Sequence, residues 1–182
     1  MSEEGDCYSY FRLNNRGKGA AVRTGIDAAK GDVFLIQDAD LELTPCDIPV
    51  MLQAMHDQKV EFVNGSRYLT GIDRPKFSYG RYFFNQLFTM ITALLTCSRI
   101  TDMACGYKLF HRNLYEKIRL HEDRFCFETE MIIKAIRVKK NNMTEVPVHY
   151  FPRNEKQGKK LKTIDGLIIF WAIIKYGLLR LN

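Results

Sequence analysis

The stretch Gly31-Asp-Val-Phe-Leu-Ile-Gln-Asp-Ala-Asp-Leu-Glu42 decides the fold of this chain. Four apolar residues at 33–36 predict a buried strand, and Asp38 opens the loop that follows it. Residues two apart on an extended segment point to the same side, so Asp38, Asp40 and Glu42 can converge on one cation. Short Asp-x-Asp matches also occur in solvated turns, and the pattern alone leaves that alternative open.

The segments around this stretch alternate between helical and extended patterns. Small and apolar residues recur at helical spacing over 18–30, and Gly31 then suits a left-handed helix stop. Pro45 and Asp47 predict the start of a helix that runs to about residue 58, and residues 60–63 predict a second strand. Helix, strand, helix and strand in this order indicate an α/β domain, whose ligands bind at the carboxyl ends of its strands.

The rest of the chain continues this alternation after a loop rich in Gly, Arg and Pro. The patterns predict a long apolar segment at 82–97, a short strand at 106–110, a helix at 128–139, a strand at 143–150 and a helix at 163–180. We divide the chain into an irregular segment 1–13, one domain over 14–162, and an apolar C-terminal helix over 163–182.

The composition fits one globular domain with anionic partners. The chain has 182 residues, 46% of them hydrophobic, which is enough to build a core. The net charge of +6 favours nucleotide phosphates, an acidic membrane surface or nucleic acid. We predict no nucleic-acid partner, because the cations are dispersed and no recognised nucleic-acid motif appears. Five cysteines without Cys-x-x-Cys spacing predict reduced thiols in a cytosolic protein, and the acidic start predicts no signal peptide.

Two apolar stretches bear on membranes. Residues 82–97 carry no charge but fall short of the roughly twenty residues that span a bilayer. Residues 167–181 are apolar except for Lys175 and Arg180, and several lysines precede them, a pattern typical of a helix on anionic headgroups. For both stretches a buried core helix and an interfacial helix remain open, and no spanning helix is predicted.

A glycine-rich segment precedes the first helix. Residues 15–25 place glycines and the cations Arg16 and Lys18 just before a helix N-terminus, an arrangement suited to phosphate. The spacing is not that of a P-loop, and a plain loop leading into the helix is the alternative. Lys18 is therefore a candidate for substrate binding.

These motifs, taken in order, resemble the inverting family 2 glycosyltransferases. The series consists of Gly-Lys-Gly-Ala-Ala-x-Arg-x-Gly25, Ala-x-Gly-Asp32, Gln-Asp-Ala-Asp-Leu-Glu42, Gly-Ser-Arg-Tyr68, Thr101-Asp-Met-Ala-Cys-Gly-Tyr-Lys108, Arg124-Phe-x-Phe-Glu-x-Glu130, Glu145-Val-Pro-Val-x-Tyr150 and Gln157-Gly-Lys-Lys160. The closest branch contains dolichol-phosphate mannose synthases and bacterial polyprenyl-phosphate sugar transferases. The resemblance covers nearly the whole chain from about residue 14. It implies a GT-A, Rossmann-like three-layer α/β sandwich.

The resemblance implies a divalent metal at the acidic triplet. In such enzymes the triplet coordinates Mg²⁺ or Mn²⁺, which bridges the diphosphate of a nucleotide sugar, and here it falls on Asp38, Asp40 and Glu42. A bound metal neutralises charge on the departing nucleoside diphosphate, a Lewis-acid contribution. Asp40 is accordingly expected to serve both metal binding and catalysis.

Three further residues are candidates for catalysis and phosphate binding. Arg67 and Arg81 offer bidentate forks to phosphate oxygens, with a surface salt bridge as the alternative. Asp102 matches the family's acidic residue in the acceptor region, with a helix cap or turn as the alternative. A phosphate nucleophile is already ionised near neutral pH, so we expect Asp102 to orient rather than to deprotonate.

The C-terminal third supplies the remaining candidates. Glu128 and Glu130 begin a helix, where the dipole alone favours acids, and the resemblance implies a role near the sugar or acceptor. Arg153, Lys159 and Lys160 form a basic loop suited to a lipid phosphate or to the nucleotide diphosphate. Many relatives carry Gly-x-Ser-Lys at this loop, whereas this chain has Gly-Lys-Lys, which bears on the acceptor more than on the reaction.

The front of the chain departs from the family. Members begin with a Pro-x-Tyr-Asn-Glu strand end and a second strand carrying an Asp, which hold the base and ribose of the nucleotide. Residues 1–13 contain neither and are too short to do so. We expect the chain to lack one strand-helix-strand unit, which in general takes about 30 residues or more, and to bind nucleotides poorly.

The expected activity is metal-dependent transfer of a sugar, with inversion, from a nucleotide diphosphate sugar to a polyprenyl phosphate. A glycosyltransferase of cell-surface polysaccharide synthesis, with a sugar acceptor, and a non-catalytic membrane-associated remnant are the alternatives. We expect a cytoplasmic protein that is peripheral at the cytoplasmic face of a membrane. The sequence leaves a homo-oligomer open and names neither the base nor the sugar.

Overall fold

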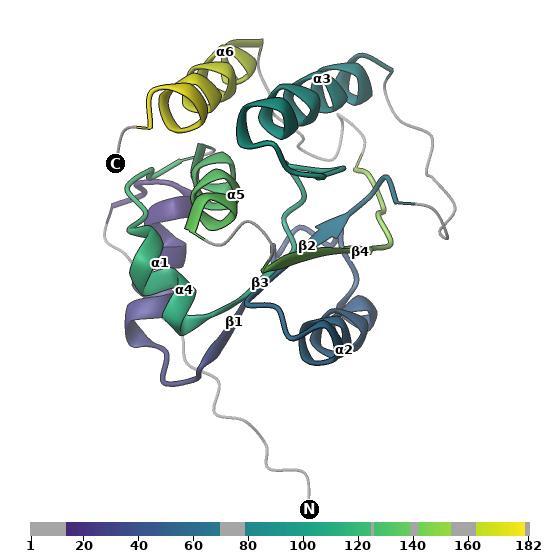
Figure 1. Ribbon diagram of the computed structural model, residues 1–182, viewed down its shortest axis with the longest axis vertical. Helices are drawn as coiled ribbons and strands as arrows, with labels where there is room; N and C mark the ends of the chain where they lie inside the picture. Colours follow the sequence, from purple (N-terminus) through teal and green to yellow (C-terminus); the bar gives the residue numbers. More distant parts are fainter. Residues whose placement is uncertain (1–13, 70–78, 125, 139–141, 154–162, 181–182) are drawn as a thin grey trace, which may run out of the picture.

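A four-stranded mixed sheet forms the centre of the domain (Figure 1). The computed structural model describes residues 14–69, 79–124, 126–138, 142–153 and 163–180. The strands β1 (Val33–Ile36), β2 (Phe62–Ser66), β3 (Lys108–His111) and β4 (Met143–Pro147) lie in the order β1-β3-β2-β4. Because β3 is antiparallel to β1 and β2 while β2 and β4 are parallel, the ends of β1, β2 and β4 share one edge with the start of β3.

The helices cover both faces of this sheet. They are α1 (Lys18–Ala28), η1 (Pro45–Asp47), α2 (Ile48–Gln58), α3 (Tyr79–Thr96), α4 (Arg112–Ile118), α5 (Cys126–Val138), α6 (Thr163–Ala172) and the π-helical turn η3 (Ile173–Leu178). Figure 1 shows α2 on one side of the sheet and α1, α4 and α5 on the other. The fold therefore consists of three layers.

Alternation of side chains along the strands separates two apolar cores. Phe34 and Phe62 pack against Phe110 from either side, with ring centroids 5.7 and 6.4 Å away, on the face covered by α5. Val63 and Leu109 point the opposite way, toward α2. Burial of both cores fixes the strand register, because a slip of one residue would exchange the two faces.

Helices α3 and α6 lie at the top of Figure 1, and η3, which continues α6, is in contact with α3. Their inner surfaces are buried, and the outer surfaces carry large exposed apolar side chains: Phe83, Phe84, Met90, Leu94, Leu167, Ile168, Phe170 and Trp171. Helices at both predicted apolar stretches are thus confirmed, and each is partly buried and partly exposed. Across the described ranges, no helix has the length and apolar character needed to cross a bilayer.

Most predicted elements are confirmed, with ends that shift by a few residues. Helix α4 was not predicted, because seven residues are too few to establish a helical period. The left-handed stop at Gly31 is wrong: α1 ends at Ala28, and Ala29 after it is extended. In the described chain the glycine with positive φ is Gly17, at 108°, on the other end of the same helix. The predicted irregular segment 1–13 lies outside the described residues.

Candidate active site

The candidate site lies along the sheet edge where β1, β2 and β4 end and β3 begins. Asp38 follows β1, Arg67 follows β2, Asp102 lies on the segment before β3, and Arg153 follows β4. The mixed topology brings these four loops together, because the antiparallel β3 starts where its neighbours finish. This is the edge at which α/β sheets bind ligands.

Asp38 forms an ion pair with Lys18. The Lys18 ammonium lies 2.7 Å from Asp38 Oδ2 and 2.5 Å from Glu128 Oε1, so it joins β1, α1 and α5. Burial alone lowers the pKa of Lys18, but the charges of Glu128 and Asp38 outweigh it and raise that pKa above its ordinary value. Lys18 is therefore charged throughout the physiological range.

Glycines allow these elements to approach one another. A Cβ on Gly19 would lie 2.1 Å from the carbonyl oxygen of Glu122, and one on Gly106 would lie 2.6 Å from Asp38 Oδ2. Gly17 also needs the φ of 108° that other residues avoid. The two glycines of Gly-Lys-Gly thus allow the start of α1 to pack closely against α5. This close packing places Lys18 beside Glu128.

Asp40 and Glu42 face a second cation. Arg153 Nη2 donates to Asp40 Oδ2 at 2.9 Å, and the Arg153 backbone N–H donates to Glu42 Oε1 at 3.0 Å. Glu42 Oε2 accepts a hydrogen bond of 2.9 Å from the Tyr150 hydroxyl. The backbone joins the same loops, because Leu43 pairs with Tyr150 and the Phe151 N–H donates to the Glu42 carbonyl.

The three carboxylates are not gathered into one group in the described structure, so their joint binding of one cation stays a prediction. No group of three or more Asp, Glu, His or Cys side chains in the described ranges is placed to hold a metal ion. The reason lies in the backbone: the chain turns after Asp38, and Leu41 adopts a left-handed φ of 61°. The spacing of two along an extended strand therefore does not apply beyond Asp38.

Two of the three carboxylates still suit a hard divalent ion. Asp38 and Asp40 are oxygen donors of the kind that Mg²⁺ and Mn²⁺ prefer, and each already holds a cation through one oxygen. Their side chains are 33% and 28% exposed, so an ion can reach them. Glu42 does not fit as well, because both of its oxygens accept hydrogen bonds from the loop after β4.

Arg67 and Asp102 form a bidentate ion pair. Arg67 Nε and Nη2 donate to the two Asp102 oxygens at 2.6 and 2.8 Å, and the Arg67 backbone N–H adds a third contact. Asn85 of α3 donates to Asp102 as well, at 3.2 Å. Burial of Asp102 opposes ionisation, but Arg67 outweighs it and lowers the pKa of the carboxyl. Asp102 is therefore a weak base whose oxygens are already engaged.

A buried polar network holds the loop that carries Asp102 of the Arg67–Asp102 pair. Lys108 donates to Asn64 at 2.7 Å and to the Cys105 carbonyl at 2.8 Å. The Asn64 amide donates in turn to the Asp102 carbonyl and to Glu145, at 2.8 Å each. Glu145 also accepts from the Thr101 N–H and hydroxyl at 2.7 Å. The loop that carries Asp102 is therefore fixed from β2, β3 and β4 together.

The two halves of the site meet at Tyr150. The Arg67 guanidinium lies over its ring, 5.1 Å from the centroid, and its hydroxyl donates to Glu42. Cation–π contact and the hydrogen bond thus link the Arg67–Asp102 pair to the acidic loop.

Other predicted site residues are placed elsewhere or lie outside the described part. Glu130 is fully buried, accepts from the His121 and Glu122 N–H groups, and pairs with Lys134 at 2.9 Å. It points away from Glu128 because residues two apart on a helix face different sides. Arg81 lies in α3, but its side chain is outside the described structure, as are Lys159 and Lys160.

Sequence reasoning missed Asn64, Lys108, Glu145 and Tyr150 as parts of the site. A usable signal was present for two of them: Asn64 and Lys108 are polar residues directly beside the apolar pairs at 62–63 and 109–110. Such residues are buried only with partners, and are thus markers of an internal network.

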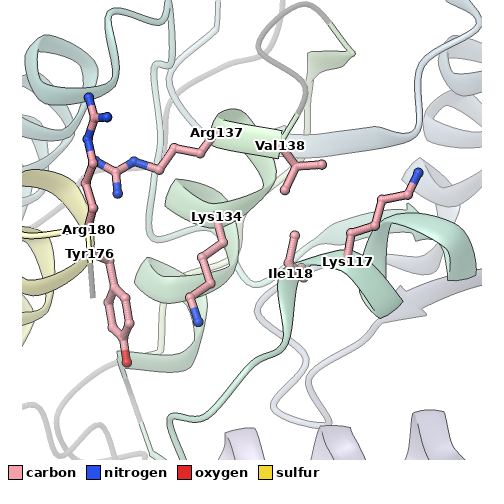
Figure 2. Close-up of a pocket in the computed structure, with 7 residues that line it drawn as sticks. All are labelled: Lys117, Ile118, Lys134, Arg137, Val138, Tyr176 and Arg180. Atoms are coloured by element: carbon pink, nitrogen blue, oxygen red, sulfur yellow. The ribbon is translucent and has the colours of Figure 1, made fainter. Parts of the chain in front are cut away.

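A separate pocket between α4, α5 and η3 is shown in Figure 2. It measures about 360 Å³, counted with the solvent at its mouth, and its lining includes Lys117, Arg137 and Arg180. These cations lie at or just beyond the C-terminal ends of their helices, and Arg137 donates to the Gly177 carbonyl at 2.5 Å. The Arg137 hydrogen bond satisfies one carbonyl near the end of η3.

The chain is similar to known proteins over most of its length. The sequence model of the family called glycosyl transferase family 2 matches residues 2–119. A dolichyl-phosphate beta-glucosyltransferase of Trichomonas vaginalis is 31% identical over 171 residues, covering 87% of this chain and 50% of that protein. A dolichol-phosphate mannosyltransferase of Pyrococcus furiosus is 30% identical over 156 residues, covering 84% and 43%. The chain spans about half the length of these curated relatives.

Among solved structures, glucosyl-3-phosphoglycerate synthase from Mycobacterium tuberculosis, in complex with Mn²⁺ and UDP-glucose, has a similar fold. The TM-score is 0.66 at 16% identity, covering 88% of this chain and 54% of that chain. At this identity the likeness concerns the fold, and it confirms the predicted GT-A architecture.

Proposed function

The chain belongs to glycosyl transferase family 2, and from that premise we propose that its protein transfers a sugar from a nucleotide diphosphate sugar to a polyprenyl phosphate. The observation that carries the proposal is that two features lie at the same edge of the sheet. One is an acidic loop whose carboxylates pair with two cations, and the other is the buried Arg67–Asp102 ion pair. Dolichyl-phosphate and dolichol-phosphate transferases among the relatives support a polyprenyl phosphate acceptor.

Asp38 and Asp40 are proposed to hold Mg²⁺ or Mn²⁺. The fold neighbour crystallised with Mn²⁺ and UDP-glucose supports this assignment. When bound, the metal supplies a Lewis acid that neutralises charge on the departing nucleoside diphosphate. Lys18 and Arg153 supply positive charge beside these carboxylates, which suits a diphosphate.

Asp102 is proposed to position Arg67 rather than to remove a proton. Its two oxygens engage the guanidinium, and its lowered pKa makes it a poor base near neutral pH. A sugar hydroxyl acceptor needs a base, whereas a phosphate acceptor is already ionised. The geometry of this pair therefore favours the phosphate acceptor over the polysaccharide alternative.

The exposed apolar surfaces of α3 and α6 are proposed to rest on a membrane, where a polyprenyl phosphate resides. The protein would then be peripheral, at the cytoplasmic face. Apolar side chains on two neighbouring helices are what such contact requires, and Trp171 is the type of residue that favours the interface.

The test is release of nucleoside diphosphate by the full-length protein. It is incubated with a panel of nucleotide sugars, UDP-glucose included, with Mn²⁺ and dolichyl phosphate, and labelled lipid product is measured. Release that depends on both the metal and the lipid is expected, and Asp40→Asn should abolish it. Equal release with a sugar acceptor in place of the lipid phosphate would reject the acceptor proposed here.

A further inference from the structure

The Lys18 ammonium forms an ion pair with Asp38, whose carboxylate is proposed to bind the metal. It contacts Asp38 Oδ2 at 2.7 Å and Glu128 Oε1 at 2.5 Å, and its side chain is only 24% exposed. A metal ion on Asp38 and the Lys18 ammonium would repel each other strongly, because the partly buried position reduces screening by water. A metal ion that binds Asp38 must therefore compete with Lys18.

The second cation repeats this arrangement. Arg153 lies 2.9 Å from Asp40 and 3.5 Å from Glu42, just as Lys18 lies between Asp38 and Glu128. Each cation thus pairs with one candidate metal ligand and with one further glutamate. In both cases the glutamate remains as a partner if the aspartate is taken by another ion.

We propose that Lys18 is an internal counter-ion of Asp38 that a divalent metal displaces, and that Glu128 retains the displaced ammonium. The inference rests on the proposed function, because it takes Asp38 to be a metal ligand. It explains why the two acids around Lys18 come from different parts of the fold, the loop after β1 and the helix α5: one is given up to the metal, and the other keeps Lys18 beside the site. The consequence is that Lys18 weakens binding of the metal alone.

The test is Mn²⁺ binding by isothermal titration calorimetry, with the metal alone as the probe. Lys18→Gln removes the competing charge, and we expect Mn²⁺ to bind about tenfold more tightly. Lys30→Gln removes the same charge from an exposed position outside the site, and its affinity should match that of the wild type. Lys18→Arg keeps the charge and should also leave the affinity near that of the wild type.

Glu128→Gln tests the second half of the proposal and gives the opposite sign. Without Glu128, displaced Lys18 has lost its other carboxylate, so Mn²⁺ should bind about threefold or more weakly. Circular dichroism and thermal melting of each variant show whether it is folded, so that a loss of structure is not read as a change in affinity.

Unchanged or weaker Mn²⁺ binding in Lys18→Gln would overturn the inference, and so would unchanged or tighter binding in Glu128→Gln. Failure of the proposed function looks different: none of the five folded proteins, wild type included, would bind Mn²⁺ at all. That result would reject the metal site itself and the inference with it.

Discussion

Lys108 donates a hydrogen bond of 2.7 Å to the amide oxygen of Asn64, and neither side chain is exposed to solvent. Burial lowers the pKa of Lys108, yet its ammonium also reaches the Cys105 carbonyl at 2.8 Å. The pair therefore fixes which way the Asn64 amide points, and with it the loop that carries Asp102.

Replacing Lys108 by Met should destabilise the protein strongly. The change leaves the Asn64 oxygen and the Cys105 carbonyl buried without this donor, which we expect to cost about 3 kcal/mol. Urea unfolding measures the loss. Lys117→Met, at an exposed position of α4, is the matched control and should change stability by less than about 0.5 kcal/mol. Similar losses in the two variants would contradict the assigned network.

Asp102→Asn should cost about 3 kcal/mol at neutral pH, because it leaves the buried Arg67 charge without its carboxylate. The folded pKa of Asp102 lies below the ordinary value of 3.8, so its contribution is complete above that value and is lost as pH falls through the folded pKa. Urea unfolding of both proteins across a pH series should show their difference shrinking below pH 3.8. A difference that grows in acid would contradict this pairing.

Two glycines of α1 should respond in opposite directions to alanine. Gly19→Ala places a Cβ 2.1 Å from the Glu122 carbonyl and 2.8 Å from Phe127 Cβ, so we expect a loss of about 2 kcal/mol. Gly25→Ala meets nothing within 4 Å and should stabilise the helix by about 1 kcal/mol. Thermal unfolding measures both. If Gly19→Ala were also stabilising, the close contact between α1 and the segment before α5 would be wrong.

Trp171 should report membrane contact directly. It is the one tryptophan in the chain and is 60% exposed on α6. Vesicles containing phosphatidylserine should shift its fluorescence to shorter wavelength, because the indole leaves water. Trp171→Phe removes the signal but should still sediment with the vesicles. Unshifted fluorescence together with protein left in the supernatant would argue against the membrane proposal.

The sequence predicted the parts of the site that depend on local pattern. Hydrophobic periodicity and the glycines predicted three elements that lead to the expected sheet edge: the strand before Asp38, the helix after Gly17 and the strand before Arg67. The opposite directions of Glu128 and Glu130 could have been predicted as well, because helix geometry alone separates residues two apart.

What the sequence could not predict depends on distant contacts and on one turn. Asn64 and Glu145 are 81 positions apart, and no local pattern pairs them. The left-handed Leu41 ends the extended conformation after Asp38, which is why Asp40 and Glu42 face Arg153 and the loop after β4 instead of a shared ion.

Tyr150 contacts both halves of the site. Its backbone bridges to Leu43, its hydroxyl holds Glu42, and its ring supports the Arg67 guanidinium. If the chain just after β4 changes position, the contacts of Tyr150 with the acidic loop and with Arg67 change together. Arg67, which follows β2, and Arg153, which follows β4, are thus connected through Tyr150 and its hydrogen bond to Glu42.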